Sequence, residues 1–537
     1  MTRSDEDDPL GLETGRPVKP PRTAGSRLTS WLDKAQVVVL FAALIAHPTA
    51  FAFDLGGGSE SSPRRVIASF GLMGHPAGGK APHMYVTIAD ILIGIGFGLY
   101  VLRWLLRWKW RAMPRAPLPV VLIMVWFALS AISSLKPGRG REVEFSAKSF
   151  VKEFLQAFEY LVAAYLVFEE GFRSERIRRA AAVILLALAT VVVAWAWVHY
   201  ADVSGTASAL KVSGPLATRN SLGSTLALML PFAFGVGLFS GCAGLLAWSI
   251  VVVAAGLLVI LSGGALLATA LALMGVAFLK HRWWFVGTGA IVVAGFALLS
   301  FFPALPRDNI RILEDSLLLY RGQAPRGRTE FKKSPDPYGV LEWMSRVDEV
   351  KGQAGVAAQE SWAWRQKYKE WQIALRMIVD SPLFGMGGGA FAVNTGRYYN
   401  KMLYDGRSIP KLDVDLMEPE GQNYYLLLGA TLGIPAVFFL VWLLLDHARY
   451  AMAGLSTHGL DRGVAAGALG ALAAFAVVCV FTEPLVRGTG VTFIVMLALA
   501  RSLSPYGKAA PAPNAAKEPV MESEEPDAPA EEDKRVS

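Results

Sequence analysis

The chain contains blocks of about 17 to 25 apolar residues with few charges, and these blocks restrict its possible folds more than any other feature. A helix of that length crosses a hydrocarbon core about 30 Å thick. The composition agrees, because 53% of the residues are hydrophobic and 18% are charged, whereas soluble domains carry about 25% charged residues. The sequence therefore predicts an all-α polytopic membrane protein and argues against a soluble enzyme.

The apolar blocks predict about twelve transmembrane helices in two groups. Residues 34–304 hold the first nine, near 34–54, 87–106, 118–135, 152–168, 180–199, 221–240, 243–261, 264–279 and 284–304. Residues 423–504 hold the other three, near 423–445, 463–482 and 488–504. The polar segment 1–33 lacks the pattern of a cleavable signal peptide, so the first block is expected to remain as an anchor. The acidic segment 505–537, rich in Pro and Ala, is predicted to be a disordered tail.

The basic residues indicate an orientation. The formal net charge of +8 could suggest nucleic acid, but the basic side chains cluster in short loops between apolar blocks. With the N-terminus inside, these loops all fall on the cytoplasmic side, as the positive-inside rule requires. We therefore predict that both termini are cytoplasmic and that nucleic acid is not a partner. The loop residues are Arg103, Arg107, Lys109, Arg111, Arg115, Arg173, Arg176, Arg178, Arg179, Lys280, His281 and Arg282.

One connection, residues 305–422, is long enough to be a functional element on the outer, periplasmic side. Its segment 361–380 is predicted to contain an amphipathic helix at the membrane surface, with Trp371, Leu375 and Ile378 on the apolar face. Pro382 ends this helix, and a glycine cluster at 385–389 follows. The cluster allows close approach of a ligand to the backbone, but a plain turn is the favoured interpretation.

Arginine and aromatic side chains are interleaved along the same loop. Guanidinium groups bind phosphate through two contacts, which points to an anionic, phosphorylated substrate. The alternative for any single arginine is a solvated charge or a contact with a lipid headgroup. The set includes Arg307, Arg311, Arg321, Arg326, Arg328, Arg346, Arg365, Arg376, Arg397 and Arg407, with Trp343, Trp362, Trp364, Tyr368, Tyr398, Tyr399 and Tyr404.

Carboxylates occur both at the end of this loop and inside the apolar blocks. Glu420 lies just before the tenth block and is a candidate general base, while the nearby pair Asp413 and Asp415 leaves a divalent metal as a less favoured alternative. Charges inside the blocks are costly in lipid and are expected to face the protein interior. They are Asp90, Glu153, Glu159 and Glu483, and for Glu159 we expect an arginine partner on another helix.

Three segments together resemble one family of bacterial envelope enzymes. They are GPLATRNSLGSTLALMLP at 214–231, WQIALRMIVDSPLFGMGGGAF at 371–391 and QNYYLLLGATLGIP at 422–435. Weaker similarity is present in TIADIL at 87–92 and KEFLQAFEYLVAAYLVF at 152–168. In order and spacing, these segments resemble the O-antigen ligase and O-antigen polymerase superfamily of glycosyltransferases. The middle segment is the most specific.

The resemblance implies a glycosyltransferase C-like fold in the bacterial inner membrane. Enzymes of this family transfer a glycan from undecaprenyl diphosphate to an acceptor hydroxyl at the periplasmic face, without a nucleotide sugar, metal or other cofactor. The implied partners are the lipid-linked glycan, a saccharide or lipid acceptor, membrane lipids and other proteins of polysaccharide assembly. By position, the resemblance gives Arg219 and Arg365 the role of stabilising the departing diphosphate, with Asn220, Arg376 and Tyr368 contacting the substrate.

The chain departs from the family pattern at two places. Gln422 stands where the family has a histidine thought to activate the acceptor, and glutamine cannot take up a proton near neutral pH. We therefore prefer Glu420 as the base, with Gln422 and Asn423 orienting the acceptor. The other departure is Ser262-Gly263-Gly264, where many members have Ser-Arg-Gly, so one phosphate-binding arginine is missing.

These observations leave several functions open. Polymerisation of polysaccharide repeat units is favoured because the ligase-type histidine is absent. A ligase that transfers glycan to the lipid A-core of lipopolysaccharide is the nearest alternative. A flippase or transporter of the lipid-linked glycan, or a non-catalytic scaffold of the export machinery, is the alternative from another class. A transporter should place polar residues at mid-membrane on several helices, whereas here they concentrate at the outer ends.

Overall fold

The computed structural model describes residues 24–48, 52–54, 85–107, 116–134, 147–203, 215–216, 219–260, 262–290, 370–391, 394–395, 398, 423–485 and 489–503. In these ranges the protein is helical apart from two short strands, β1 (Ala52–Asp54) and β2 (Tyr85–Thr87). The strands pair antiparallel, with Phe53 opposite Val86, and join the end of the first helix to the start of the second. The all-helical fold predicted from the apolar blocks is confirmed at this level.

The helices follow the apolar blocks of the sequence. In the first part of the chain they are α1 (Ala24–Ala46), α2 (Ile88–Arg107), α3 (Leu118–Ser134), α4 (Ala147–Phe158), η2 (Glu159–Ala164), α5 (Tyr165–Phe172), α6 (Glu175–Val203), α7 (Arg219–Phe239), α8 (Ala243–Val259) and α9 (Gly263–Lys280). Further helices cover residues 282–290 and 370–380. The C-terminal group is α15 (Tyr424–Leu432), α16 (Ile434–Gly454), α17 (Gly459–Phe481) and α18 (Thr489–Ser502).

Six of the described helices are long and apolar enough to cross a membrane, namely α2, α6, α7, α9, α16 and α17. The helices α3, α8 and α18 are apolar but shorter. These features are those of a helical membrane protein. The total of about twelve spans and the periplasmic position of the long loop stay predictions.

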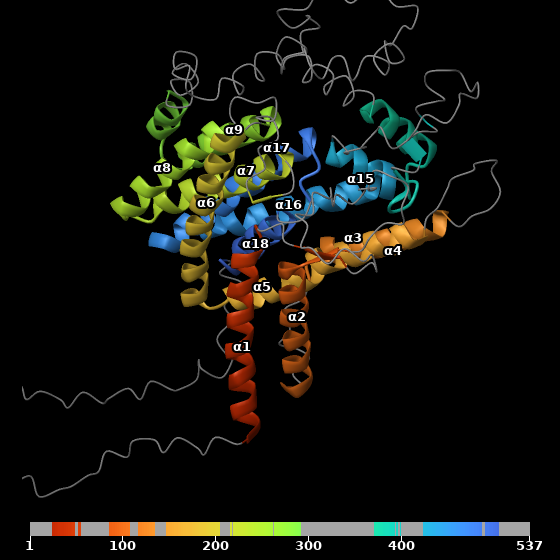
Figure 1. Cartoon of the computed structure of the whole chain (residues 1–537), viewed down its shortest axis with the longest axis horizontal. Helices are drawn as coiled ribbons and strands as arrows, with labels where there is room; N and C mark the ends of the chain where they lie inside the picture. The colour runs from red at the N-terminus through yellow and green to blue at the C-terminus, as the bar shows by residue number, and fades with distance from the viewer. Residues whose placement is uncertain are drawn as a thin grey trace, which may run out of the picture.

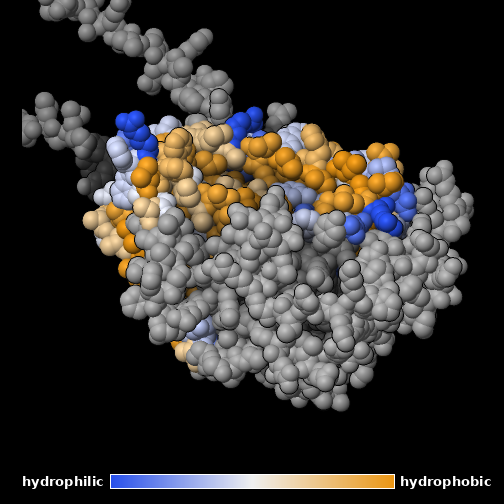
Figure 2. Space-filling model, turned by 90° about the horizontal axis from the view of Figure 1, so that it is seen from above, coloured by the Kyte–Doolittle hydropathy of each residue, from blue (hydrophilic) through white to orange (hydrophobic). Residues whose placement is uncertain are grey.

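Large apolar side chains lie on the outside of the helices, as lipid requires. Val198, Val251, Phe278 and Phe438 are each more than 60% exposed. Figure 2 shows such residues from above as an orange band with blue residues at its margins. A water-soluble protein rarely exposes a contiguous apolar surface of this extent, so the band is best explained as a lipid-facing surface.

The centre of the fold is the antiparallel pair α7 and α17 (Figure 1). Every residue of α7 from Ser221 to Phe239 is buried. Glycines permit this contact, because a Cβ atom on Gly467 would lie 2.5 Å from the carbonyl oxygen of Phe232. A Cβ on Gly235 would lie 2.4 Å from the amide nitrogen of Gly467. The two backbones therefore touch directly, which is the packing that small residues provide between membrane helices.

Two predicted spans differ from the structure. The first, 34–54, is too long at its end, because α1 stops at Ala46 and Ala52–Asp54 forms β1. The tenth, 423–445, is not continuous, since it is divided into α15 and α16 at Gly433. Gly433 has a φ of 89°, a left-handed conformation that no helix continues through. Hydropathy records the apolar character of both segments but not these breaks in the backbone.

The helix at 370–380 exists, and the contact of its predicted apolar face with the membrane surface stays a prediction. Glu370, Ile373, Ala374 and Met377 are the buried residues, whereas Leu375 is 50% exposed. The sequence from 371 to 379 is apolar around most of the helix, so its periodicity does not define one face. Packing against the rest of the protein selects which side is buried.

Candidate functional site

The site is built on one long helical segment, in which α4, η2 and α5 follow one another without a gap from 147 to 172. Glu153, Gln156, Ala157, Tyr160 and Leu161 recur at helical spacing and line one cavity. The π-helical turn η2 lies in this stripe, and the amide of Tyr165 donates to the carbonyl of Tyr160, five residues earlier. Such turns insert an extra residue into a helix and are frequent at functional sites.

The cavity lies between α3, α4, α15 and α18. It contains about 670 Å³ of space not filled by atoms, part of which is open to the outside. Most of its wall is apolar, and its polar groups are few, which is the usual composition of a small-molecule site. The lining residues are Ile123, Phe127, Glu153, Gln156, Ala157, Tyr160, Leu161, Gly388, Tyr424, Leu427, Leu428, Thr431, Leu432, Leu485 and Ile494.

Two carboxylates belong to this region. Glu153 lines the cavity and is 5% exposed, and Glu483 lies just after α17 and is 8% exposed. Both lie near Tyr424, which also lines the cavity. The polar side of the cavity therefore carries carboxyl and other hydrogen-bonding groups, with no arginine or lysine among its lining residues in the described part of the chain.

The glycine cluster forms one wall of the cavity by docking onto the end of α15. The amide of Met386 donates to the carbonyl of Ala430 at 2.8 Å, and the amide of Gly387 donates to that of Thr431 at 2.9 Å. In return, the amide of Ile434 donates to the carbonyl of Pro382 at 2.8 Å. The favoured interpretation of the cluster as a turn agrees with this geometry, since these amides bind protein carbonyls rather than facing open space.

Side chains of α3 hold this docked segment in place. The indole nitrogen of Trp126 donates to the carbonyls of Leu383 and Leu432, at 3.0 and 2.9 Å. Its ring stacks on Phe384 with centroids 5.1 Å apart. A Cβ atom on Gly388 would lie 2.6 Å from the ring of Phe127, so only glycine allows the close packing there. The second and third family-like segments, 371–391 and 422–435, are thus in direct contact.

The first family-like segment reaches the same region through α18. The hydroxyls of Thr225 and Thr489 are 2.7 Å apart, and Thr489 also donates to the carbonyl of Ser221 at 3.3 Å. A Cβ on Gly490 would lie 3.1 Å from the ring of Tyr160, which lines the cavity. The start of α7, where the segment 214–231 becomes helical, therefore lies one helix away from the cavity.

The structure describes some of the predicted site residues and shows where they lie. Asn220 is half-buried in the first turn of α7, and Arg219 begins that helix, although its side chain is outside what the structure describes. Arg376 is exposed on the helix 370–380 and does not line the cavity. Asn423 caps α15, because its side-chain oxygen accepts from the amide of Leu426 at 3.0 Å. Arg365, Tyr368, Glu420 and Gln422 lie outside the described residues.

The charges inside the predicted spans have different roles. Asp90, which is predicted to face the protein interior, is half-buried and caps the start of α2. Its carboxylate accepts from the amide of Thr87 at 2.8 Å, while the Thr87 hydroxyl accepts from the amide of Asp90 at 3.1 Å. This reciprocal pair is a capping box, and it explains the weak family-like segment TIADIL in local terms. The expected arginine partner of Glu159 stays a prediction.

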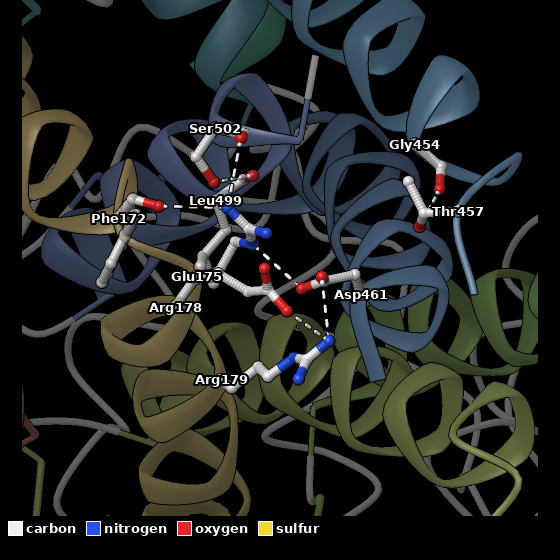
Figure 3. A network of polar contacts seen from close by, with 9 residues as sticks. All are labelled: Phe172, Glu175, Arg178, Arg179, Gly454, Thr457, Asp461, Leu499 and Ser502. Carbon is white, nitrogen blue, oxygen red and sulfur yellow. Dashed lines mark hydrogen bonds and ion pairs between the residues drawn. The ribbon is translucent and has the colours of Figure 1, made fainter. Parts of the chain in front are cut away.

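A second polar region lies at the other ends of the same helices (Figure 3). Arg178 at the start of α6 donates to Asp461 at the start of α17, at 3.0 Å, and also to the carbonyls of Phe172 and Ser502. Arg179 is 3.6 Å from the same Asp461. The ion pairs here form two neighbouring groups, Arg178 and Arg179 with Asp461, and Arg103, Arg173 and Arg501 with Asp33, Glu169 and Glu170. We call the two groups together the arginine network.

The residues that sequence reasoning missed are Gln156 and Tyr424 as site residues, together with the assignment of Glu153 to the site. The signal was present in KEFLQAFEYL, where 153, 156, 157, 160 and 161 fall on one face of a helix. The sequence alone could not tell that this face borders a cavity rather than another helix.

Taken together, the apolar helices, the lipid-facing surface and the internal cavity define a polytopic helical membrane protein. No protein-family model matches the chain, and no curated protein matches it.

Proposed function

We propose that this protein is a membrane glycosyltransferase that moves a glycan from undecaprenyl diphosphate to an acceptor hydroxyl at the periplasmic face. Its product is a polysaccharide lengthened by one repeat unit. One observation carries the proposal: the second and third family-like segments, far apart in the sequence, contact each other at the cavity, and the first begins α7 one helix away from it.

The chemistry requires stabilisation of a leaving diphosphate. When the bond between the sugar and the phosphate breaks, negative charge grows on the diphosphate, and positioned guanidinium groups stabilise that state more than the ground state. Arg219 and Arg365 carry this role in the proposal, while Asn220, Arg376 and Tyr368 contact the donor. The position of Asn220 in the first turn of α7, beside the Thr489 contacts, supports its inclusion.

The acceptor is held on the other side of the reacting carbon. Glu420 and Gln422 immediately precede α15, and Asn423 is its N-cap residue. Because the side-chain oxygen of Asn423 is engaged in the cap, a contact with the acceptor comes from its amide nitrogen. The residue that follows the cap, Tyr424, lines the cavity.

The protein acts in the bacterial inner membrane, with both termini in the cytoplasm. This orientation is supported by the arginine network, because it gathers the basic ends of α2, α5, α6 and α18 in one region. Basic residues concentrate on the cytoplasmic side of membrane proteins. The opposite ends of α4 and α18, which border the cavity, then face the periplasm.

Reconstitution with a lipid-diphosphate-linked oligosaccharide tests the proposal. Proteoliposomes are supplied with the donor and with either a second repeat unit or a lipid A-core acceptor, and the products are separated by size. Longer glycan supports a polymerase, and glycan on the lipid A-core supports a ligase. Movement of the donor across the bilayer without transfer would instead support a flippase and overturn the proposal.

Arg219→Ala and Arg365→Ala sharpen the same assay. Removing one donor of transition-state stabilisation lowers the transfer rate by about 100-fold or more. The matched variants Arg219→Lys and Arg365→Lys keep the charge but lose the two-point geometry, so they retain part of the activity. Normal glycan length in both alanine variants would contradict the assigned role.

A further inference from the structure

The cavity and the predicted arginines differ in charge, and this difference suggests separate places for the two substrates. Glu153 and Tyr424 line the cavity, and Glu483 lies near Tyr424. Two neighbouring carboxylates disfavour a diphosphate, which carries negative charge itself. A neutral saccharide with hydroxyl groups has no such conflict.

We propose that the cavity binds the acceptor saccharide and that Glu153 is a catalytic residue which removes the proton from the attacking hydroxyl. This inference rests on the proposed function and names a base among the described residues, in a position different from that of Glu420. The donor diphosphate then lies outside the cavity, on the side of α7.

The walls of the cavity suit a sugar ring. Phe127, Tyr160 and Tyr424 present aromatic faces, and most of the remaining lining residues are aliphatic. An apolar wall excludes water, and exclusion of water protects a reactive glycosyl donor from hydrolysis. The few polar groups of an apolar site also fix the orientation of the ligand, because the ligand must place a hydrogen-bonding group opposite each of them.

Gln156 provides a second polar group aimed at the same ligand. It lies three residues after Glu153, so both side chains are on one face of α4. Its amide nitrogen is buried and has no hydrogen-bond partner among the residues that the structure describes. A buried donor without a partner is costly, and an acceptor oxygen in the cavity would satisfy it.

The carboxylate of Glu153 takes the proton of the acceptor hydroxyl, and the freed oxygen forms a bond to the anomeric carbon of the donor. The bond between that carbon and the phosphate oxygen breaks, and its electron pair leaves with the diphosphate. A positioned general base contributes about 100-fold to 10,000-fold to such a transfer.

The experiment compares a nucleophile that needs a base with one that does not. Purified Glu153→Gln in proteoliposomes receives the lipid-linked donor with either the saccharide acceptor or azide, an anion that has no proton to lose. We expect transfer to the saccharide to fall at least 100-fold, while formation of glycosyl azide is retained or rises, because the change also removes a carboxylate that repels the anion. Equal loss of both reactions would show a structural role and overturn the inference.

Matched variants keep the test decisive. Glu159→Gln changes another half-buried carboxylate of the same helical segment, one that does not line the cavity, and should leave both reactions unchanged. Glu153→Asp keeps the acid and should recover part of the saccharide transfer, which covers the case in which Glu153→Gln folds poorly. Gln156→Ala should raise the KM for the saccharide without changing the azide reaction.

Two outcomes separate this inference from the function on which it rests. If Glu420→Gln loses only saccharide transfer and Glu153→Gln keeps it, then Glu420 is the base and the inference is overturned. If the wild-type protein transfers glycan to neither saccharide nor azide, the proposed function itself fails.

Discussion

The cavity and the arginine network lie at opposite ends of the same helices. Both contain buried carboxylates, but the groups around these carboxylates differ. Glu153 and Glu169 lie on one helical segment, roughly 24 Å apart at 1.5 Å per residue. Glu169 is 3.3 Å from the guanidinium of Arg501, inside a network of ion pairs. Glu153 instead lines the cavity, most of whose wall is apolar.

This difference separates a structural role from a chemical one. In the arginine network, guanidinium groups lie beside the buried acids, so the region joins the ends of α5, α6, α17 and α18. In the cavity, the carboxylates lie beside a tyrosine and a space that a ligand can enter. We therefore expect changes in the network to alter stability and changes near the cavity to alter transfer.

The largest effect on stability is expected from Asp461→Ala. Arg178 and Asp461 have side chains only 10% and 11% exposed, so the change leaves a buried guanidinium without its partner. Loss of one member of such a pair costs about 3–5 kcal/mol of folding free energy. Thermal unfolding in detergent micelles measures it.

The double variant Arg178→Met with Asp461→Leu is the matched control, because it removes both charges and keeps apolar volume. It should recover most of the lost stability, and glycan transfer per folded molecule should equal that of wild type. An unchanged unfolding temperature in Asp461→Ala would remove the structural role of the network.

Gly433→Ala tests the wall of the cavity. The φ of Gly433 is 89°, and a Cβ atom there would lie 2.1 Å from the carbonyl of Leu383. Strained backbone of this kind costs about 1–3 kcal/mol, and the collision must also displace the docked segment. We expect a lower unfolding temperature together with reduced transfer.

Gly459→Ala is the comparison for that variant. Its φ of 60° is also left-handed, but a Cβ atom there meets nothing within 4 Å. It should therefore show the backbone strain alone and keep the transfer rate per folded molecule. If both glycine variants behave alike, the docked segment does not shape the cavity.

A smaller effect is expected from Thr489→Val, which removes the contacts to Thr225 and to the carbonyl of Ser221. One buried hydrogen bond contributes about 1 kcal/mol. The double variant Thr225→Val with Thr489→Val should be less unstable than the sum of the single variants, because the two hydroxyls share one bond. Simple additivity in unfolding experiments would show that the contact does not link α7 to α18.

The smallest effect is expected from Arg449→Ala. Arg449 is paired with Asp446 at 3.0 Å, but its side chain is 72% exposed. Exposed ion pairs contribute little, so the change in stability should stay within about 0.5 kcal/mol. A loss comparable to that of Asp461→Ala would mean that burial does not distinguish ion pairs in this region.

Much of the fold follows from hydropathy because lipid imposes a simple rule on spanning helices. The predicted 87–106 and 118–135 correspond to α2 and α3 almost residue for residue. The break at Gly433 was missed, since its cause is a left-handed φ and a close contact with Leu383, which lies far away in the sequence. Tertiary contacts of this kind leave no periodic signal.

The candidate site was less predictable for the same reason. Glu153 was identified as a costly charge, but its stripe on α4 resembles any amphipathic face until a neighbouring cavity is seen. Asp90 was identified in the same way and proved to be a helix cap. A charge inside an apolar block therefore indicates that the residue has a specific role. Only the packing shows whether that role is to line a cavity or to cap a helix.

The π-helical turn η2 has a mechanical consequence for the segment that contains it. An α-helix rotates by about 100° with each residue, and a π turn holds one residue more than α geometry would. Deleting one residue between Glu159 and Ala164 would let this turn close into regular helix. The halves bearing Glu153 and Glu169 would keep their relative orientation, because the deletion removes the residue that the π turn absorbs. Closing the turn with all its residues kept would instead rotate Glu153 by about 100°, away from the hollow it borders.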